Sequence, residues 1–329
     1  TLILILVMSI SLVNAQKSKV VSAYNFIKPQ YNELDKAKEA IDEATVHETT
    51  ANWDKTWYYR GMVYHAIYQS TDSAIQALHP NPLREAVDAY VKALQLDEKK
   101  KYEKDIMNRL NTAAIQFLNK GISDFNNGDY NASLDAFVNS VYVNALPQIN
   151  LIDTMAIFNA AIAADRAHNY EKAIEYYSKA AELKYEGPKV YAFLANSYKA
   201  AGDTLGSVEA LKQGIEMWPN DNSLLMVELI NYYLTADKTD EAMSYLEKAI
   251  EKDPENYSYY FAIGTLYEKK ENYEKAIEFY QKTLEINPEY FDAQYNMGAV
   301  YYNKAVSHYT IANDIPAKEQ KKYEAEIAK

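Results

Sequence analysis

The stretch from Tyr257 to Pro288, YSYYFAIGTLYEKKENYEKAIEFYQKTLEINP, predicts two amphipathic helices joined by a short turn. In each half, apolar or small residues recur at the three- and four-residue spacing of one helix face. The polar residues 269–272, KKEN, interrupt the pattern, and Pro288 ends it because proline cannot continue a helix. The stretch therefore predicts a helical hairpin.

Small residues mark the place where these two helices should cross. Two helices approach closely only where side chains are small, and Gly264 and Ala276 are the small residues on the two apolar faces. We expect the rings of Tyr260, Tyr267 and Tyr280 to fill the space around that contact.

The same arrangement recurs along the chain with a period close to 34 residues. Pro254 precedes Pro288, and Ala242 precedes Ala276, by 34 residues each. A helix–turn–helix unit of this period, with a large residue, x2-Ile-Gly-x2-Tyr, then Ala-x3-Tyr, then Pro, resembles the tetratricopeptide repeat. Units that resemble it occupy residues 54–97, 114–147, 154–187, 188–221, 223–256 and 257–290, and the first helix of a further unit follows.

The resemblance covers most of residues 54–302 and implies an all-α fold. The expected architecture is a right-handed α-solenoid of stacked antiparallel helix pairs, a TPR-like superhelix of about six repeats. A single pair cannot bury its apolar face alone, so stacking is expected to create a continuous core.

The first unit departs from the pattern. Gly61 and Ala86 are 25 residues apart, whereas Gly264 and Ala276 are 12 apart, which predicts a longer first helix or an inserted loop at about residues 67–82. This unit also has Arg60 where the family usually has leucine.

The flanking segments are expected to be helical as well. Residues 16–53 are expected to form an N-terminal helical or capping segment, in which residues 31–45 fit either the second helix of a repeat or a capping helix. Residues 303–329 predict an extended C-terminal helix, and their charged end without a stop signal indicates a truncated chain.

Composition excludes several classes of function. The net charge is −12, from 46 acidic and 34 basic residues, which disfavours a surface for nucleic acid or anionic lipid. The chain has no cysteine, so disulfides, thiolate nucleophiles and cysteine-ligated metals are excluded. The 31 tyrosines could form a stacking surface for a ligand, but most fall on the helical stripes, which favours a role in packing.

Residues 1–15, TLILILVMSISLVNA, match a secretory signal peptide with cleavage after Ala15. The apolar run is too short for a membrane span, which needs about 20 residues. The alternative is a buried N-terminal helix. Cleavage predicts an exported protein, periplasmic or associated with the cell envelope, with no membrane span afterwards.

No catalytic, cofactor or metal motif occurs in the sequence. The five histidines lack partners at ligand spacing, and we expect each to lie on the surface or in a loop. No Gly-rich dinucleotide loop, Walker loop or nucleophile elbow is present. Acidic residues stand among lysines at helical spacing, as on solvated helix faces. The sequence therefore predicts that the protein is not an enzyme and binds no cofactor.

The resemblance also implies a binding surface, because in the family the first helices line a concave groove for a peptide or a helix. Three asparagines would supply amide donors in a row that is otherwise mostly apolar and aromatic. The alternative is that several of these side chains contact a neighbouring helix instead. The groove residues carried over by position are Tyr58, Met62, Leu118, Ile122, Phe158, Asn159, Ile162, Ala192, Asn196, Val227, Asn231, Phe261, Thr265, Tyr295 and Ala299.

One subtype of the family is disfavoured. Members that clamp the C-terminal carboxylate of chaperones use Lys, Asn and Arg on these helices, where this chain has Tyr58, Phe158, Val227 and Phe261. An apolar or amphipathic partner is expected instead.

The expected function is a non-enzymatic scaffold that binds a protein or peptide in the bacterial cell envelope, with an envelope protein as partner and no nucleic acid. The alternative is the repeat region of a larger polypeptide whose catalytic or signalling domain lies beyond residue 329.

Overall fold

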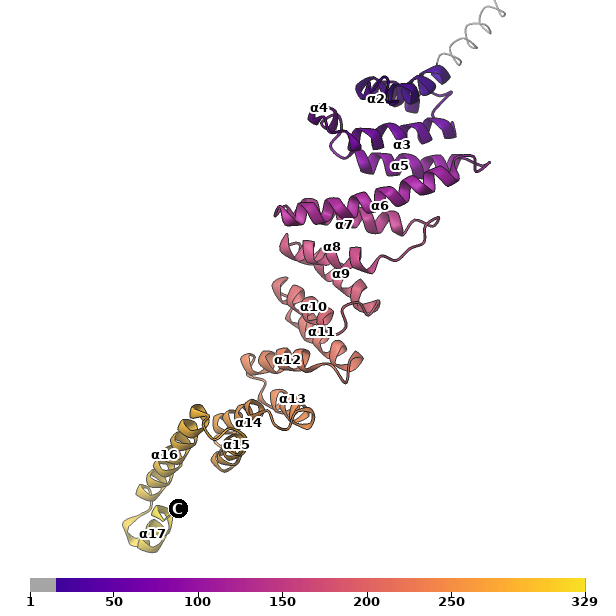
Figure 1. Ribbon diagram of the computed structural model, residues 1–329. Coiled ribbons are helices and arrows are strands. Elements are labelled where there is room, and N and C mark those ends of the chain that lie inside the picture. Colours follow the sequence, from indigo (N-terminus) through magenta and orange to yellow (C-terminus); the bar gives the residue numbers. More distant parts are fainter. Residues whose placement is uncertain (1–15, 329) are drawn as a thin grey trace, which may run out of the picture. The chain divides into compact units, whose positions relative to one another are not determined.

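The computed structural model describes residues 16–328, and every regular element in that range is a helix (Figure 1). The predicted all-α fold is confirmed. Helices pair with their neighbours in sequence, and the pairs stack, which is the arrangement of an α-solenoid. Within this range, no helix combines the length and apolar character that crossing a membrane requires. The predicted signal peptide, residues 1–15, lies outside the described residues.

The chain forms two compact units, one up to Tyr185 and one from Glu186 onward. In the first unit, residues 16–26 are helical and precede three helix pairs, α3 with α5, α6 with α7, and α8 with α9. Its helices are α2 (Leu34–Val46), α3 (Asp54–Gln69), α4 (Ser73–Gln76), α5 (Pro82–Leu96), α6 (Glu103–Asn126), α7 (Tyr130–Asn144), α8 (Thr154–Arg166) and α9 (Tyr170–Glu182).

The second unit continues the pattern with the pairs α10 with α11, α12 with α13, and α14 with α15. The long helix α16 then packs against α15, and α17 packs back against α16. The elements are α10 (Lys189–Ala200), α11 (Thr204–Met217), α12 (Ser223–Thr235), α13 (Thr239–Lys252), α14 (Tyr257–Lys269), α15 (Tyr273–Ile286), α16 (Phe291–Asn313), the 3-10 helix η1 (Ala317–Glu319) and α17 (Gln320–Ile327).

Local sequence sets the turn between the helices of a pair. In α6–α7 the turn ends with Gly128, whose φ of 81° is readily adopted only by glycine, followed by Asp129. The Asp129 carboxylate accepts a hydrogen bond from the Ala132 backbone N–H, which caps α7. Gly202 and Asp203 repeat this arrangement before α11. The polar breaks in the sequence pattern are therefore capped hairpin turns.

An aromatic ring of the second helix lies over a glycine of the first in several pairs. A Cβ on Gly264 would lie 2.6 Å from the Tyr280 ring, and one on Gly121 would lie 2.7 Å from the Phe137 ring. The predicted contact at Gly264 is thus confirmed, and Tyr280 is fully buried. Only a residue without a side chain permits this approach.

The first repeat has the expected extra segment between its helices. α3 continues to Gln69, and the short helix α4 (Ser73–Gln76) lies in the connection before α5. His79, at the end of this connection, contacts the ring of Tyr64 edge-on, with ring centroids 5.2 Å apart. The connection therefore packs back onto α3.

Candidate functional site

Three of the predicted groove residues are half-buried and pack against tyrosines of other segments. Phe158 of α8 lies against Tyr185, with ring centroids 5.4 Å apart, and Phe261 of α14 lies edge-on to Tyr290 at 5.0 Å. In the first repeat, Tyr58 stacks on Tyr102 at 4.4 Å and donates a hydrogen bond to a carboxylate oxygen of α6. In each case the partner tyrosine precedes the next first helix. These rings therefore pack each first helix against the connecting segment that follows its helix pair.

A hollow in the first unit gathers three other predicted residues. Ile122 of α6 lines it together with Asn159 and Ile162 of α8. Phe137 of α7 also lines it, and Ile122 is 43% exposed. The remaining lining residues are Phe125 and Asn126 of α6. This hollow offers an apolar surface with amide groups at its edge.

A larger hollow of about 300 Å³ lies between α10 and α12 in the second unit. Its lining includes the predicted residues Ala192 and Asn196 of α10 and Asn231 of α12. Lys199 and Glu228 also line it, on the same two helices. The sequence interpretation missed these two, although their spacing of three residues from Asn196 and Asn231 places them on the same helix faces.

The amide groups in the larger hollow have no internal partner. Asn196 and Asn231 are exposed, and within residues 16–328 neither side chain makes a hydrogen bond. Both residues directly follow the small or apolar residue at the helix crossing, Ala195 and Ile230, so they occupy equivalent places in successive repeats. An amide supplies both donors and an acceptor. Two such groups, one repeat apart, can bind a peptide backbone.

The remaining predicted residues are dispersed. Met62 packs against the core of the first unit, and Leu118 lines a separate hollow beside Ile115 and Leu151. The Thr265 hydroxyl donates to the carbonyl oxygen of Ala262. Val227 and Tyr295 are exposed, and Ala299 is half-buried.

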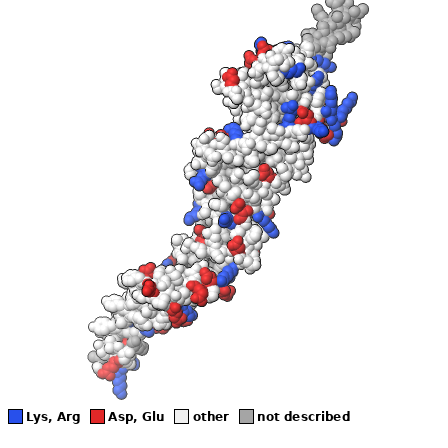
Figure 2. All heavy atoms as spheres, in the orientation of Figure 1, with Lys and Arg blue, Asp and Glu red and all other residues white. Residues whose placement is uncertain are grey.

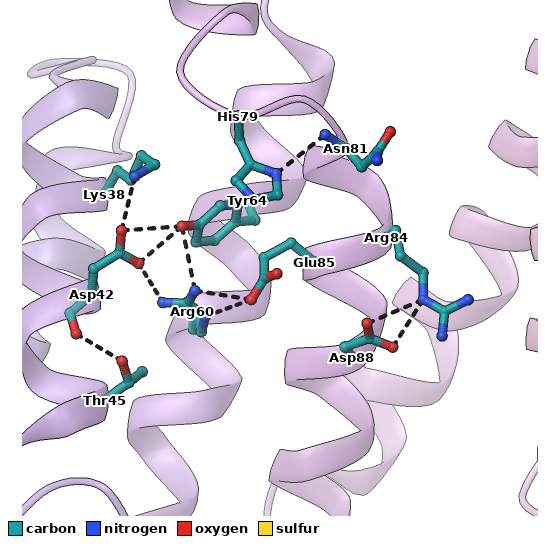
Figure 3. Close-up of polar contacts among 10 residues, drawn as sticks. All are labelled: Lys38, Asp42, Thr45, Arg60, Tyr64, His79, Asn81, Arg84, Glu85 and Asp88. Carbon is teal, nitrogen blue, oxygen red and sulfur yellow. Dashed lines mark hydrogen bonds and ion pairs between the residues drawn. The ribbon is translucent and has the colours of Figure 1, made fainter. Parts of the chain in front are cut away.

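The most connected group of charged residues lies between α2, α3 and α5 (Figure 3). Arg60 donates to Asp42 and, at 2.9 and 3.0 Å, to a carboxylate oxygen of Glu85. The Tyr64 hydroxyl donates to Asp42 at 2.9 Å, and Lys38 forms an ion pair with the same carboxylate at 2.9 Å.

Burial alone would raise the pKa of the Asp42 carboxyl, but the hydrogen bond from Lys38, the charge of Arg60 and the hydrogen bond from Tyr64 outweigh it. The pKa therefore lies below its ordinary value. Because each charge in this cluster is paired with an opposite charge, the cluster holds three helices together and offers no free acid or base.

His65 corrects the expectation that every histidine lies on the surface or in a loop. It is buried in α3, where its Nε2 lies 2.7 Å from Oε1 of Gln116 on α6. Burial lowers the pKa of His65, which favours the neutral ring. Gln116 is 51 residues away, so no local pattern could reveal this partner.

No group of three or more potential metal-ligating side chains occurs in residues 16–328. Figure 2 shows acidic and basic side chains interspersed along the face in view, as on solvated helix surfaces. The hollows lined by first helices are therefore the strongest candidate sites.

Comparisons with known proteins agree with the repeat pattern. Three family models match, one described as TPR repeat over residues 269–304 and two as tetratricopeptide repeat over residues 245–278 and 231–256. The mitochondrial import receptor subunit TOM70 of Saccharomyces cerevisiae is 33% identical over 122 residues, which cover 32% of this chain and 19% of TOM70. The matched part thus spans about a fifth of that relative.

Two solved structures of repeat proteins match parts of this chain. YrrB, a TPR protein with an unusual peptide-binding site, matches with 19% identity and a TM-score of 0.40, over 64% of this chain and 98% of YrrB. A TPR repeats protein from Bacteroides fragilis matches with 13% identity and a TM-score of 0.45, over 57% of this chain and 98% of that protein.

Proposed function

The chain belongs to the tetratricopeptide repeat family, and from that premise we propose that it is a non-enzymatic scaffold that binds an extended peptide of a partner protein. Repeats of this family indicate a protein–protein interaction scaffold. The observation that supports binding of an extended peptide is the pair of unpartnered amides, Asn196 and Asn231, in the hollow between α10 and α12.

An extended peptide suits this hollow because its backbone exposes one donor and one acceptor per residue. The amide groups of Asn196 and Asn231 can each satisfy both, as the strands of a sheet do for one another. Binding through the backbone makes the site tolerant of the peptide's side chains. Lys199 and Glu228, which form no ion pair within residues 16–328, can then select charged side chains of the peptide.

The hollow of the first unit suits an apolar side chain. Ile122, Ile162 and Phe137 give it an apolar lining, and a single buried aliphatic or aromatic side chain contributes about 1.5–3 kcal/mol. Partners with apolar or amphipathic segments fit such a surface, whereas a carboxylate clamp would require cations that these positions lack.

Selection from a random peptide library tests the proposal. The selected pool is expected to bind the wild-type chain and to lose about tenfold or more in affinity for the Asn196→Ala/Asn231→Ala variant. The matched control is Asn119→Ala/Asn220→Ala, which removes two exposed amides outside the hollow. Equal binding of the pool to all three proteins would exclude the hollow as the peptide site.

We further propose that the scaffold acts in the cell envelope. The support is the sequence of residues 1–15, an apolar run that ends in the small residues of a peptidase site. In that setting the partner is an envelope protein.

A further inference from the structure

A row of four half-buried tyrosine rings joins the N-terminal helical residues to α3 and to the connection before α6. Tyr24, in the helical residues 16–26, stacks on Tyr59 of α3 with ring centroids 4.5 Å apart. Tyr59 lies 5.5 Å from the ring of Tyr58, which in turn stacks on Tyr102 at 4.4 Å. Three of the four rings, Tyr58, Tyr59 and Tyr102, also pack against the core of the first unit. This aromatic row is therefore a fixed part of the fold.

Three lysines lie over the aromatic row. Each ammonium group is within the distance of about 6 Å at which a cation is attracted to the face of a ring. The attraction restricts the positions that each ammonium group can take. The distances from the lysine Nζ to the ring centroid are 5.1 Å for Lys28 over Tyr24, 5.2 Å for Lys55 over Tyr59 and 5.0 Å for Lys101 over Tyr102.

These three ammonium groups have no carboxylate partner within residues 16–328. By contrast, Lys19 and Lys100, from the same stretches of the chain, each form an ion pair with a glutamate. Lys28 donates one hydrogen bond, to the side-chain oxygen of Asn25 at 2.7 Å. Because an ammonium group has three donors, most of the donors on these three lysines remain available to an anion.

We propose that the aromatic row and its three lysines bind an acidic, extended segment of another protein. The chain as a whole has a net charge of −12, so a surface with three unpaired cations is a local exception that is complementary to carboxylates. Residues 1–15 contain no charged residue and therefore cannot supply these carboxylates. The surface is separate from the hollow between α10 and α12, and this inference does not depend on peptide binding there.

The rings themselves have no free face for a nucleic-acid base. Tyr24 and Tyr59 face each other, and stacked rings with centroids 4.5 Å apart leave no room for a lysine between them. Lys28 and Lys55 must therefore cover the outer faces of these two rings. Bases that bind to aromatic side chains stack on an open ring face. The aromatic row thus serves to hold cations in place.

A continuous polyanion does not suit the surface either, because carboxylates lie among the lysines. The pKa of Lys101 is raised by its hydrogen bond with Tyr102 and also by the charges of Asp54 and Asp97. An anionic membrane or a nucleic acid would set its own negative charges against these carboxylates. The side chains of an extended peptide are discrete, so a peptide can place its carboxylates at the lysines alone.

The test uses a rhodamine-labelled peptide of alternating Asp and Ser and measures its binding to the full chain by fluorescence anisotropy at low ionic strength. Saturable binding is expected, and added salt should weaken it because the charges are exposed to solvent. A peptide with Asn in place of every Asp has the same length without the charge and is expected not to bind. Lys28→Gln/Lys55→Gln/Lys101→Gln is expected to weaken binding of the acidic peptide by about tenfold or more.

A matched control separates the surface from the net charge of the protein. Lys184→Gln/Lys189→Gln/Lys321→Gln makes the same change of net charge at three exposed lysines in other parts of the chain, and it is expected to bind like wild type. The Asn196→Ala/Asn231→Ala variant should bind the acidic peptide normally, so this surface and the peptide hollow can fail independently.

A conservative variant separates the charge from the fold. Arginine keeps the positive charge and its attraction to a ring, so Lys28→Arg/Lys55→Arg/Lys101→Arg is expected to retain binding. The circular dichroism spectra of the glutamine and arginine variants are expected to match that of wild type.

Three outcomes would overturn the proposal. The first is an acidic peptide that does not bind, or that the two glutamine variants weaken equally. The second is binding to phosphatidylglycerol vesicles, without peptide binding, that is lost in the Lys28→Gln/Lys55→Gln/Lys101→Gln variant, which would make an anionic membrane the occupant. The third is a concentration-dependent dimer, observed by sedimentation at low ionic strength, that the same variant abolishes. A second copy of this chain would then be the occupant.

Discussion

Tyr280 of α15 lies over Gly264 of α14, so close that a Cβ on Gly264 would sit 2.6 Å from the ring. Replacing Gly264 with leucine must therefore displace a fully buried ring. We expect Gly264→Leu to lower the free energy of unfolding by more than 1 kcal/mol, within the overpacking range of about 1–3 kcal/mol. Thermal denaturation measures the effect.

Gly298→Leu is the control for this substitution, since it makes the same change at an equivalent helical position with nothing within 4 Å. It is expected to be neutral, or to stabilise by up to about 1 kcal/mol through the better helix propensity of leucine. Equal melting temperatures for the two variants would contradict the role assigned to the Gly264–Tyr280 contact.

Tyr290 joins the last complete helix pair to α16. Its ring lies 5.0 Å from Phe261 and 4.9 Å from Tyr257. Each such pair contributes about 0.5–1.5 kcal/mol beyond the area it buries, so Tyr290→Ala is expected to destabilise the second unit by about 1–3 kcal/mol. Urea denaturation measures this loss. Tyr295→Ala removes an exposed ring nearby and should change stability by less than about 0.5 kcal/mol.

Acid is expected to weaken the cluster that joins α2, α3 and α5. The pKa of Asp42 is lower in the folded protein than its ordinary value of 3.8. A carboxyl with a lowered pKa stabilises the fold above its ordinary pKa, and this stabilisation is lost as the pH falls through the folded value. Asp42→Asn should therefore be less stable than wild type near neutral pH, by about 1 kcal/mol after allowance for solvent screening.

The pH dependence of that difference is the measurement. Denaturation midpoints of wild type and Asp42→Asn should converge as the pH falls below 3.8, because the wild-type carboxyl then becomes neutral as well. A difference that stays constant as the pH falls below 3.8 and through the lower pKa of the folded protein would show that Asp42 acts through packing and not through its charge.

The contacts that could be predicted from the sequence lie within one repeat. Gly264 and Tyr280 are 16 residues apart, and their spacing follows from helix geometry alone. Whether Phe261 faces a groove or packs internally depends on Tyr290 in the connection between α15 and α16, and the periodic pattern does not encode that choice. The periodic pattern does not predict the burial of His65 either, because its partner Gln116 lies on α6. Asn196 and Asn231 line one hollow because equivalent positions of successive repeats share one face.

The N-terminal segment is expected to be cleaved during export. Residues 1–15 should be removed so that the mature chain begins at Gln16, because Val13 and Ala15 are small enough for a signal peptidase and residues 16–19, QKSK, are polar. Expression of the complete gene, cell fractionation and N-terminal sequencing of the product measure this directly. Replacing Ala15 with a bulky residue such as tryptophan should block cleavage and leave the leader attached, whereas Gln30→Trp, at an exposed position beyond the leader, should not affect processing. An intact leader on wild-type protein in the cytosolic fraction would overturn the proposed envelope location, and the partner would then have to be sought in the cytosol.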